Sequence, residues 1–175
     1  GRMTPTAGEP HSRKLVSSGR PWLHQNVVIV DPESARECPA ASVGEIWISG
    51  PCVADGYWNR PEETTRTFDA YIEPDRRGPF LRTGDLGFFD DGELFISGRL
   101  KDLIIIRGRN YFPDDIEYTV RKLHEAFAVG STVAIGFETD GEERLVILQE
   151  IDRGNRRLDT EQLTILIRQT IAEEL

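Results

Sequence analysis

The hydrophobic pattern of this 175-residue chain changes once, near "SGRLKD" at residues 97–102. Before that point the apolar runs are short and end at Gly, Pro or Asp, which is typical of strands joined by turns. After it, the pattern predicts a strand, a helix, two strands and a second helix. We therefore expect an α+β chain of two units: a β-rich unit over residues 1–97 and a small α/β unit over residues 98–175.

The first unit is expected to contain two strands, a short helix and a hairpin. Pro61 in the first turn, followed by two glutamates near the positive end of the dipole, favours the helix. Gly92 in "DDG" can take a positive φ and favours the hairpin turn. In chain order, the predicted elements are a strand over 27–34, a strand over 44–51, a helix over 59–68 and a hairpin over 86–98.

In the second unit we expect a strand over 103–106, a hairpin over 131–152 that turns at "DG", and two amphipathic helices. The first helix covers 111–124, with Pro113 near its start, and the second covers 159–175, with Asp159 or Thr160 as its cap. Apolar residues recur at helical spacing in both. These predicted stripes are Ile116, Val120 and Leu123, and Leu163, Leu166, Ile167 and Ile171.

Charge and cysteine usage limit the classes of function. The formal net charge of −9 argues against nucleic acid or an anionic membrane surface as a partner. No apolar run approaches the roughly 20 residues of a membrane-spanning helix. Cys38 and Cys52 lack metal-site spacing, so we expect two free thiols and a cytoplasmic protein, with a disulfide as the alternative. His11, His24 and His124 are scattered, which favours surface or capping roles over a metal site.

Asp85 is the first candidate for binding chemistry. It follows a glycine in "LRTGDLG" (81–87), between two strand-like segments. A carboxylate presented at a strand end can accept two hydrogen bonds from a vicinal diol, such as the 2′- and 3′-hydroxyls of ribose. Arg99 lies across the predicted hairpin, so the two side chains are expected to come close. The alternatives are a turn-capping aspartate and a simple ion pair.

Lys101 and Gly108 are candidates for a different reason. Lys101 and Asp102 lie where the pattern changes, which is where a hinge is expected, and hinge residues need not be small. Gly108, between Arg107 and Arg109, would let the backbone approach a ligand closely. An exposed charge pair and a turn glycine are the alternatives.

Together and in this order, the motifs "TGD", "GRLKDLI" and "GRNYFPDDIE" resemble those of the adenylate-forming superfamily of acyl-CoA synthetases, luciferases and peptide-synthetase adenylation domains. The chain is most similar to the fatty acyl-AMP ligase branch, and the resemblance covers residues 15–175. The stretches most similar to that branch are "GRPW" (19–22), "GPCVADGYWNRPEET" (50–64), "PFLRTGDLGF" (79–88) and "DLIIIRGRNYFPDDIE" (102–117).

This resemblance implies a reaction in two halves. A fatty acid and ATP, with Mg²⁺, give an acyl-adenylate and pyrophosphate. A small domain then rotates, and the acyl group passes to the phosphopantetheine thiol of an acyl carrier protein of a polyketide or nonribosomal peptide synthase. Residues 1–97 would be the last β-rich subdomain, a distorted barrel, of the large domain. Residues 98–175 would be the small mobile domain.

The same resemblance implies roles for single residues. Asp85 would bind the ribose hydroxyls of ATP and of the acyl-adenylate, and Arg99 the same ribose or the neighbouring phosphate. Lys101 would be the hinge. Gly108 and Arg109 would line the pantetheine channel after rotation.

Other parts of such an enzyme are expected outside this chain. These are the phosphate loop, the fatty-acid tunnel, the glutamate that holds Mg²⁺ and the C-terminal catalytic lysine, which is absent from the chain. The chain alone is therefore expected to be inactive. An acyl-CoA ligase, an amino-acid adenylation domain and a non-catalytic adenylation-like module that binds a partner or an adenylate are the alternatives.

Overall fold

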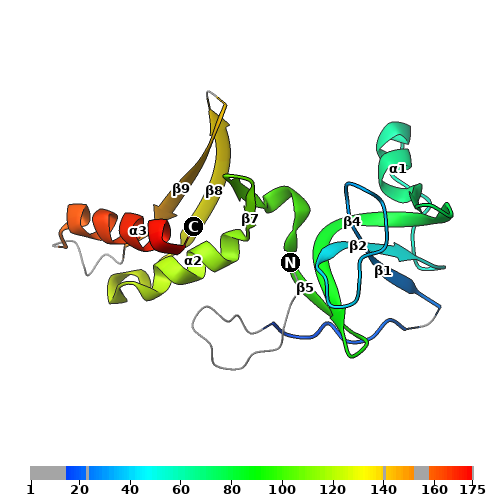
Figure 1. Ribbon diagram of the computed structural model, residues 1–175, viewed down its shortest axis with the longest axis horizontal. Coiled ribbons are helices and arrows are strands. Elements are labelled where there is room, and N and C mark those ends of the chain that lie inside the picture. Colours follow the sequence, from blue (N-terminus) through cyan, green and yellow to red (C-terminus); the bar gives the residue numbers. More distant parts are fainter. Residues whose placement is uncertain (1–14, 23, 140, 152–157, 175) are drawn as a thin grey trace. The chain divides into compact units, whose positions relative to one another are not determined.

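A computed structural model describes residues 15–22, 24–139, 141–151 and 158–174 (Figure 1). The chain divides into two compact units, Gly1–Lys101 and Asp102–Leu175. The first is built mainly of strands, and the second combines helices with paired strands. This confirms the α+β class. The assignment of residues 1–97 and 98–175 to a large and a small enzyme domain stays a prediction.

The first unit is an antiparallel sheet of five strands in the order β1-β2-β4-β3, with β5 also paired to β4. The long central strand β4 curves along its length, so the sheet is curled (Figure 1). A short helix, α1, starts at Pro61, two residues later than the predicted start at residue 59. The elements are β1 (Asn26–Val30), β2 (Gly44–Ser49), α1 (Pro61–Phe68), β3 (Ala70–Ile72), β4 (Arg77–Asp90) and β5 (Glu93–Arg99).

Both faces of β2 contribute to the interior of this unit. Trp47 is 2% exposed and packs near Phe80, while Ile46, on the other face of the strand, is 3% exposed. The strand is therefore buried on both sides, although its alternating sequence is typical of a half-buried strand. The buried core cluster of the unit is Val28, Val30, Trp47, Ile72 and Phe80.

Two-residue turns close two of the hairpins. Asp91 and Gly92 have φ values of 46° and 76° between β4 and β5, which confirms the positive φ predicted for Gly92. Arg107 and Gly108 have φ values of 51° and 74° and join β6 to β7. Two successive positive φ values are typical of the hairpin turns that match strand twist. The β6–β7 hairpin was not predicted. Its second strand, Arg109–Tyr111, has only three residues, which is too short for an alternating pattern to be recognised.

The second unit packs α2 and α3 on one face of the β8–β9 hairpin (Figure 1). Of the predicted stripes, Ile116, Val120, Leu163 and Ile171 are buried in this core, Leu123 and Ile167 are partly buried against it, and Leu166 is partly buried but not part of it. Asp159 caps α3, since its Oδ1 accepts hydrogen bonds from the backbone N–H groups of Glu161 and Gln162. The elements are β6 (Ile104–Ile106), β7 (Arg109–Tyr111), α2 (Pro113–Lys122), β8 (Thr132–Thr139), β9 (Glu142–Gln149) and α3 (Thr160–Glu174), with 3-10 turns at Leu100–Asp102 and Glu125–Phe127.

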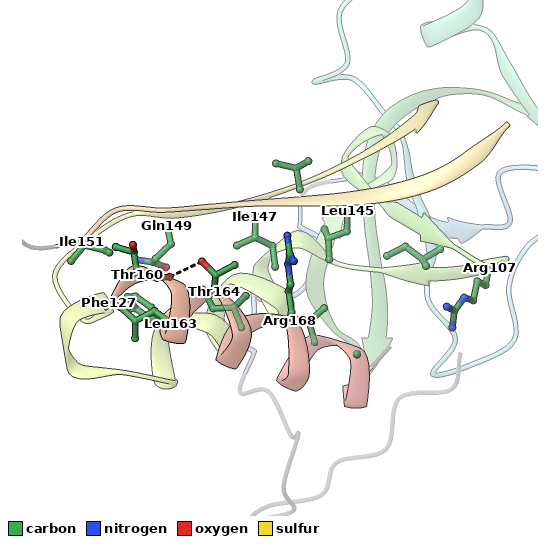
Figure 2. Close-up of a pocket in the computed structure, with 15 residues that line it drawn as sticks. Arg107, Phe127, Leu145, Ile147, Gln149, Ile151, Thr160, Leu163, Thr164 and Arg168 are labelled. Atoms are coloured by element: carbon green, nitrogen blue, oxygen red, sulfur yellow. Dashed lines mark hydrogen bonds between the residues drawn. The ribbon is translucent and has the colours of Figure 1, made fainter. Parts of the chain in front are cut away.

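A cavity of about 710 Å³ lies between β9 and α3 in this unit (Figure 2). Leu145 and Ile147 point into it from the hairpin, and Leu163 points into it from α3. Arg168 and Arg107 are the charged residues of its lining. Its walls are mostly apolar, and none of the candidate residues Asp85, Arg99, Lys101, Gly108 or Arg109 lines it.

The structure also bears on the expectations for the cysteines, the histidines and a membrane-spanning helix. Cys38 and Cys52 are free thiols, as predicted. His124 accepts a hydrogen bond at Nδ1 from the Ala126 backbone, which is the capping role that was expected, and His24 is exposed. His11 lies outside the described residues. Within the described residues, no helix is long and apolar enough to cross a membrane.

Candidate functional site

Asp85 and Arg99 face each other across β4 and β5. They are register partners, and Arg99 Nε donates to Asp85 Oδ1 at 2.9 Å. The side chains are 31% and 58% exposed, respectively, so the pair lies at the surface of its unit. This confirms the predicted closeness of the two side chains. The pair gives a surface carboxylate with one oxygen already oriented by a fixed cation.

The part of β4 around Asp85 is irregular on both sides. Glu45 of β2 pairs with Leu86, but Trp47 pairs with Arg82, so the residues at 83–85 form a bulge. A second register shift follows on the other side of β4, where Leu86 pairs with Gly98 and Gly87 pairs with Ile96. Bulges of this kind redirect a side chain at the end of a ladder.

Gly84 lies in the middle of the first bulge with φ of +72°. A Cβ added there would meet no atom within 4 Å. The glycine is therefore required by the backbone conformation and not by crowding. The "TGD" motif needs its glycine for this left-handed turn of the backbone.

Thr83 ties the bulge to β2. Its Oγ1 donates to the Ile46 carbonyl at 2.7 Å and accepts from the Asp85 backbone N–H at 3.0 Å. The hydroxyl thus uses both its donor and an acceptor position. The backbone of Asp85 is fixed to the neighbouring strand through this one side chain.

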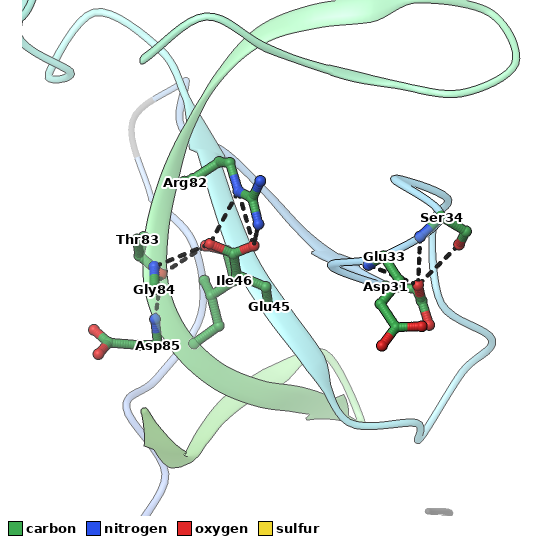
Figure 3. A network of polar contacts seen from close by, with 9 residues as sticks. All are labelled: Asp31, Glu33, Ser34, Glu45, Ile46, Arg82, Thr83, Gly84 and Asp85. Carbon is green, nitrogen blue, oxygen red and sulfur yellow. Dashed lines mark hydrogen bonds and ion pairs between the residues drawn. The ribbon is translucent and has the colours of Figure 1, made fainter. Parts of the chain in front are cut away.

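Glu45 is the most deeply buried acidic group of the site, at 1% exposure. Arg82 donates to its carboxylate from Nε at 3.0 Å and from Nη2 at 2.7 Å. The Gly84 backbone N–H donates to Glu45 Oε1 at 3.1 Å. Arg82 also lies over the Trp47 ring, 5.4 Å from its centroid. Figure 3 shows this network, with the Asp85 carboxylate directed away from Glu45.

Our sequence interpretation missed Glu45. The residue was treated only as a polar position in the alternation of "GEIWISGP". A signal was present, since a glutamate beside residues of a strand interior requires a cationic partner. The partner, Arg82, is within the "LRTGDLG" motif, but only strand pairing brings the two together.

A second polar cluster, also drawn in Figure 3, is a self-contained turn. Asp31 Oδ1 accepts from the Ser34 backbone N–H and hydroxyl and from the Glu33 N–H. These hydrogen bonds, first those from Ser34, lower the pKa of Asp31. We assign Asp31 a structural role, because these contacts stabilise its own turn.

The other candidate residues lie on exposed turns. Lys101 belongs to the 3-10 turn Leu100–Asp102 and is the last residue of the first compact unit. Gly108 and Arg109 belong to the β6–β7 hairpin of the second unit, and both are exposed. A side chain added at Gly108 would meet no atom within 4 Å, so its φ of +74° is what requires glycine.

No group of three or more His, Cys, Asp or Glu side chains among the described residues is arranged to hold a metal ion. The Asp85–Arg99 pair offers a carboxylate acceptor and a guanidinium donor, side by side on the sheet. Such a pair can bind and orient a hydroxyl-bearing, anionic ligand.

Comparisons with known proteins add independent information. Residues 3–58 match the family model described as AMP-binding enzyme. The medium-chain-fatty-acid–[acyl-carrier-protein] ligase JamA of Moorena producens is 47% identical over 98% of this chain and 29% of its own length. The long-chain-fatty-acid–AMP ligase FadD23 of Mycobacterium tuberculosis is 47% identical over 82% of this chain and 24% of its own length.

Solved structures of two enzymes are also similar to this chain. The fatty acyl-adenylate ligase from L. pneumophila, in complex with acyl adenylate and pyrophosphate, is 41% identical with a TM-score of 0.51, over 91% of this chain and 27% of that one. ATP-bound MatB from Rhodopseudomonas palustris is 30% identical with a TM-score of 0.69, over 87% of this chain and 28% of that one. The chain thus spans less than a third of the length of each.

Proposed function

Since the chain belongs to the adenylate-forming enzymes, within the fatty acyl-AMP ligase family, we propose that the whole protein activates a fatty acid with ATP and passes the acyl group to a carrier-protein thiol. The similarity to JamA, a medium-chain-fatty-acid–[acyl-carrier-protein] ligase, supports a carrier protein as the acceptor. The acyl adenylate and pyrophosphate bound to the L. pneumophila ligase support the intermediate. The chain spans 29% of the JamA sequence, so the activity is proposed for the whole protein.

The observation that supports this function best is the Asp85–Arg99 pair. Arg99 orients one carboxylate oxygen of Asp85, and the carboxylate keeps further acceptor positions at the surface. We assign these positions to the ribose hydroxyls of ATP and of the acyl-adenylate, and the Arg99 guanidinium to the same ribose or a phosphate. ATP supplies the electrophilic phosphorus and the pyrophosphate leaving group, while these two residues bind and orient the sugar.

The remaining roles follow the same proposal. Lys101, exposed at the boundary of the compact units, is the hinge between the two half-reactions. Gly108 and Arg109, exposed on the β6–β7 hairpin, line the channel for the pantetheine arm of a polyketide or nonribosomal peptide carrier protein. In the whole protein we expect ATP to act together with Mg²⁺.

The substitution Asp85→Asn tests the ribose site. An amide nitrogen replaces one carboxylate oxygen, so charge-assisted acceptor positions are lost while size is kept. In the whole protein we expect the KM for ATP to rise by about tenfold or more, measured as pyrophosphate release. Asp91→Asn, in the turn of the same hairpin, is the control, since Asp91 is 99% exposed and Asn tolerates its positive φ. An unchanged KM for ATP in Asp85→Asn would overturn the assignment.

The acceptor is tested separately. Acyl transfer from ATP and a fatty acid is measured in parallel with a phosphopantetheinylated carrier protein and with free coenzyme A. Transfer to the carrier protein alone is the expected result. Transfer to coenzyme A would place the whole protein among acyl-CoA ligases, and no pyrophosphate with a range of carboxylic acids would leave a non-catalytic binding module.

A further inference from the structure

We infer that Glu45 is a positioning residue for the nucleotide site: it holds the bulge of β4 and so sets the direction in which Asp85 leaves the sheet. The inference rests on the proposed function, because it gives Asp85 the role of a ribose ligand. Glu45 itself is 1% exposed and does not reach a ligand at the surface.

Stability alone is a weak reason for a buried glutamate here. Removing a carboxylate from water is costly even though its Arg82 partner stays 33% exposed, and well-packed apolar residues often stabilise a protein as much as a buried ion pair does. β2 is otherwise apolar at Ile46 and Trp47, so an apolar residue at position 45 would suit its surroundings. An apolar residue at this position would offer no acceptor to the Gly84 backbone N–H, which donates to the Glu45 carboxylate together with Arg82 Nε and Nη2.

The Gly84 N–H belongs to the bulge of β4 at residues 83–85. Residues 83–85 have no register partner in β2, so the N–H groups of Gly84 and Asp85 donate to the Glu45 and Thr83 side chains instead of to that strand. Glu45 Oε1 accepts from Gly84 N–H at 3.1 Å, and Arg82 engages Oε2 of the same carboxylate at 2.7 Å. Arg82 thus orients the Glu45 carboxylate, which in turn holds the Gly84 backbone N–H (Figure 3).

The space on the Cβ side of Gly84 is open, since a Cβ built there would contact nothing within 4 Å, and its left-handed conformation is one that glycine leaves easily. The hydrogen bond from Gly84 N–H to Glu45 restrains the residue in this conformation. Asp85 is the next residue, and its own N–H is held by Thr83 Oγ1. Two side chains thus position the backbone from which the Asp85 carboxylate extends. Glu45 belongs to β2, and Thr83 is hydrogen-bonded to the Ile46 carbonyl of β2.

The test uses the whole protein and measures KM for ATP, KM for the fatty acid, kcat and the melting temperature. Glu45→Gln keeps the shape but weakens the anchor to Arg82. We expect the KM for ATP to rise about tenfold, the equivalent of one lost hydrogen bond to a charged group, with an unchanged KM for the fatty acid. Glu37→Gln is the control, because it breaks an exposed ion pair with Arg77 on the same sheet. That control should leave both KM values unchanged.

A second pair of variants covers a failure of Glu45→Gln to fold. Thr83→Val removes the hydroxyl that holds the Asp85 N–H, and Thr83→Ser restores it, so the rise in KM for ATP should appear in Val and disappear in Ser. A lower melting temperature with both KM values unchanged, in Glu45→Gln or in Thr83→Val, would overturn the inference.

Asp85→Asn is measured alongside these variants to separate the two proposals. If Asp85→Asn raises the KM for ATP and the Glu45 and Thr83 variants do not, only the positioning role is wrong. If Asp85→Asn leaves the KM for ATP unchanged, the ribose site is wrong, and the positioning role is rejected with it.

Discussion

Asp85 owes its orientation to polar contacts rather than to packing. Arg99 holds its carboxylate, Thr83 holds its backbone N–H, and Glu45 holds the preceding glycine. Each contact is a directional bond to a fixed partner, which suits a residue that must present its oxygens at one angle. A candidate ligand residue at the surface is thus supported by a carboxylate in the interior of the same unit.

The two thiols differ in environment and should differ in reactivity. Burial, and secondly the negative charge of Asp31, raise the pKa of the Cys38 thiol, whereas Cys52 is exposed. Because the thiolate is the nucleophile, the pH at which alkylation of Cys38 reaches half its maximal rate should lie above the ordinary range of a cysteine thiol. At pH 8 we expect Cys52 to react with iodoacetamide about tenfold faster or more, as measured by mass spectrometry of the native chain.

Denatured chain provides the control for this comparison. In denaturant both thiols are solvated, so their rates should converge. Equal rates in the native chain would contradict the burial of Cys38.

At the scale of elements, local irregularities place the candidate residues. The bulge of β4 carries Asp85, and the two-residue turn between β6 and β7 carries Gly108. In both cases a glycine with positive φ and open space around it makes the conformation accessible. The regular parts of the strands form the frame of the sheet, while the β4 bulge and the β6–β7 turn place Asp85 and Gly108 at the surface.

The start of α3 offers a stability test at this scale. Asp159 Oδ1 accepts from the N–H groups of Glu161 at 3.0 Å and Gln162 at 3.2 Å. Asp159→Ala should lower the free energy of unfolding by about 1 kcal/mol, because two end-of-helix donors lose their acceptor. Urea unfolding followed by far-UV circular dichroism measures the loss. Asp159→Asn is the matched control and should keep most of the stability, so equal losses in the two variants would argue against the cap.

At the scale of the molecule, two compact units meet at Lys101 in the chain. Each has its own buried cluster, one around Trp47 and one around Val120 and Phe127. A separate core in each unit is what allows one unit to move as a body without unfolding. The proposed hinge function needs this property, and it needs backbone freedom at the junction.

Proline at the junction tests the hinge. Lys101→Pro fixes φ near −65° and restricts rotation, whereas Lys101→Ala removes only the charge. In the whole protein we expect Lys101→Pro to keep one half-reaction, pyrophosphate release or acyl transfer, and to slow the other by on the order of tenfold or more. Single-turnover assays of each half-reaction measure the split. Equal losses in both halves, or the same loss in Lys101→Ala, would mean that Lys101 is not a hinge.

The sequence by itself determined the local elements and the order of the motifs. Helices α1, α2 and α3 begin at Pro61, Pro113 and Thr160, within two residues of their predicted starts, and these starts and the hairpin turn at Gly92 depend on residues within a few positions of one another. Caps, apolar periods and positive-φ turns act over that range, so they can be recognised without a fold. The closeness of Asp85 and Arg99 was also predictable, because a single hairpin joins them.

Only the tertiary structure decided what surrounds those motifs. The burial of Glu45, its bond to Gly84 and the bulge at residues 83–85 all require β2 to pair with β4, although the two are separated by α1 and β3 in the chain. The short β6–β7 hairpin likewise exists because its strands pair with each other, not because a three-residue strand has a recognisable pattern. Strand pairing and burial are non-local, since their free energy depends on partners that the local sequence does not specify.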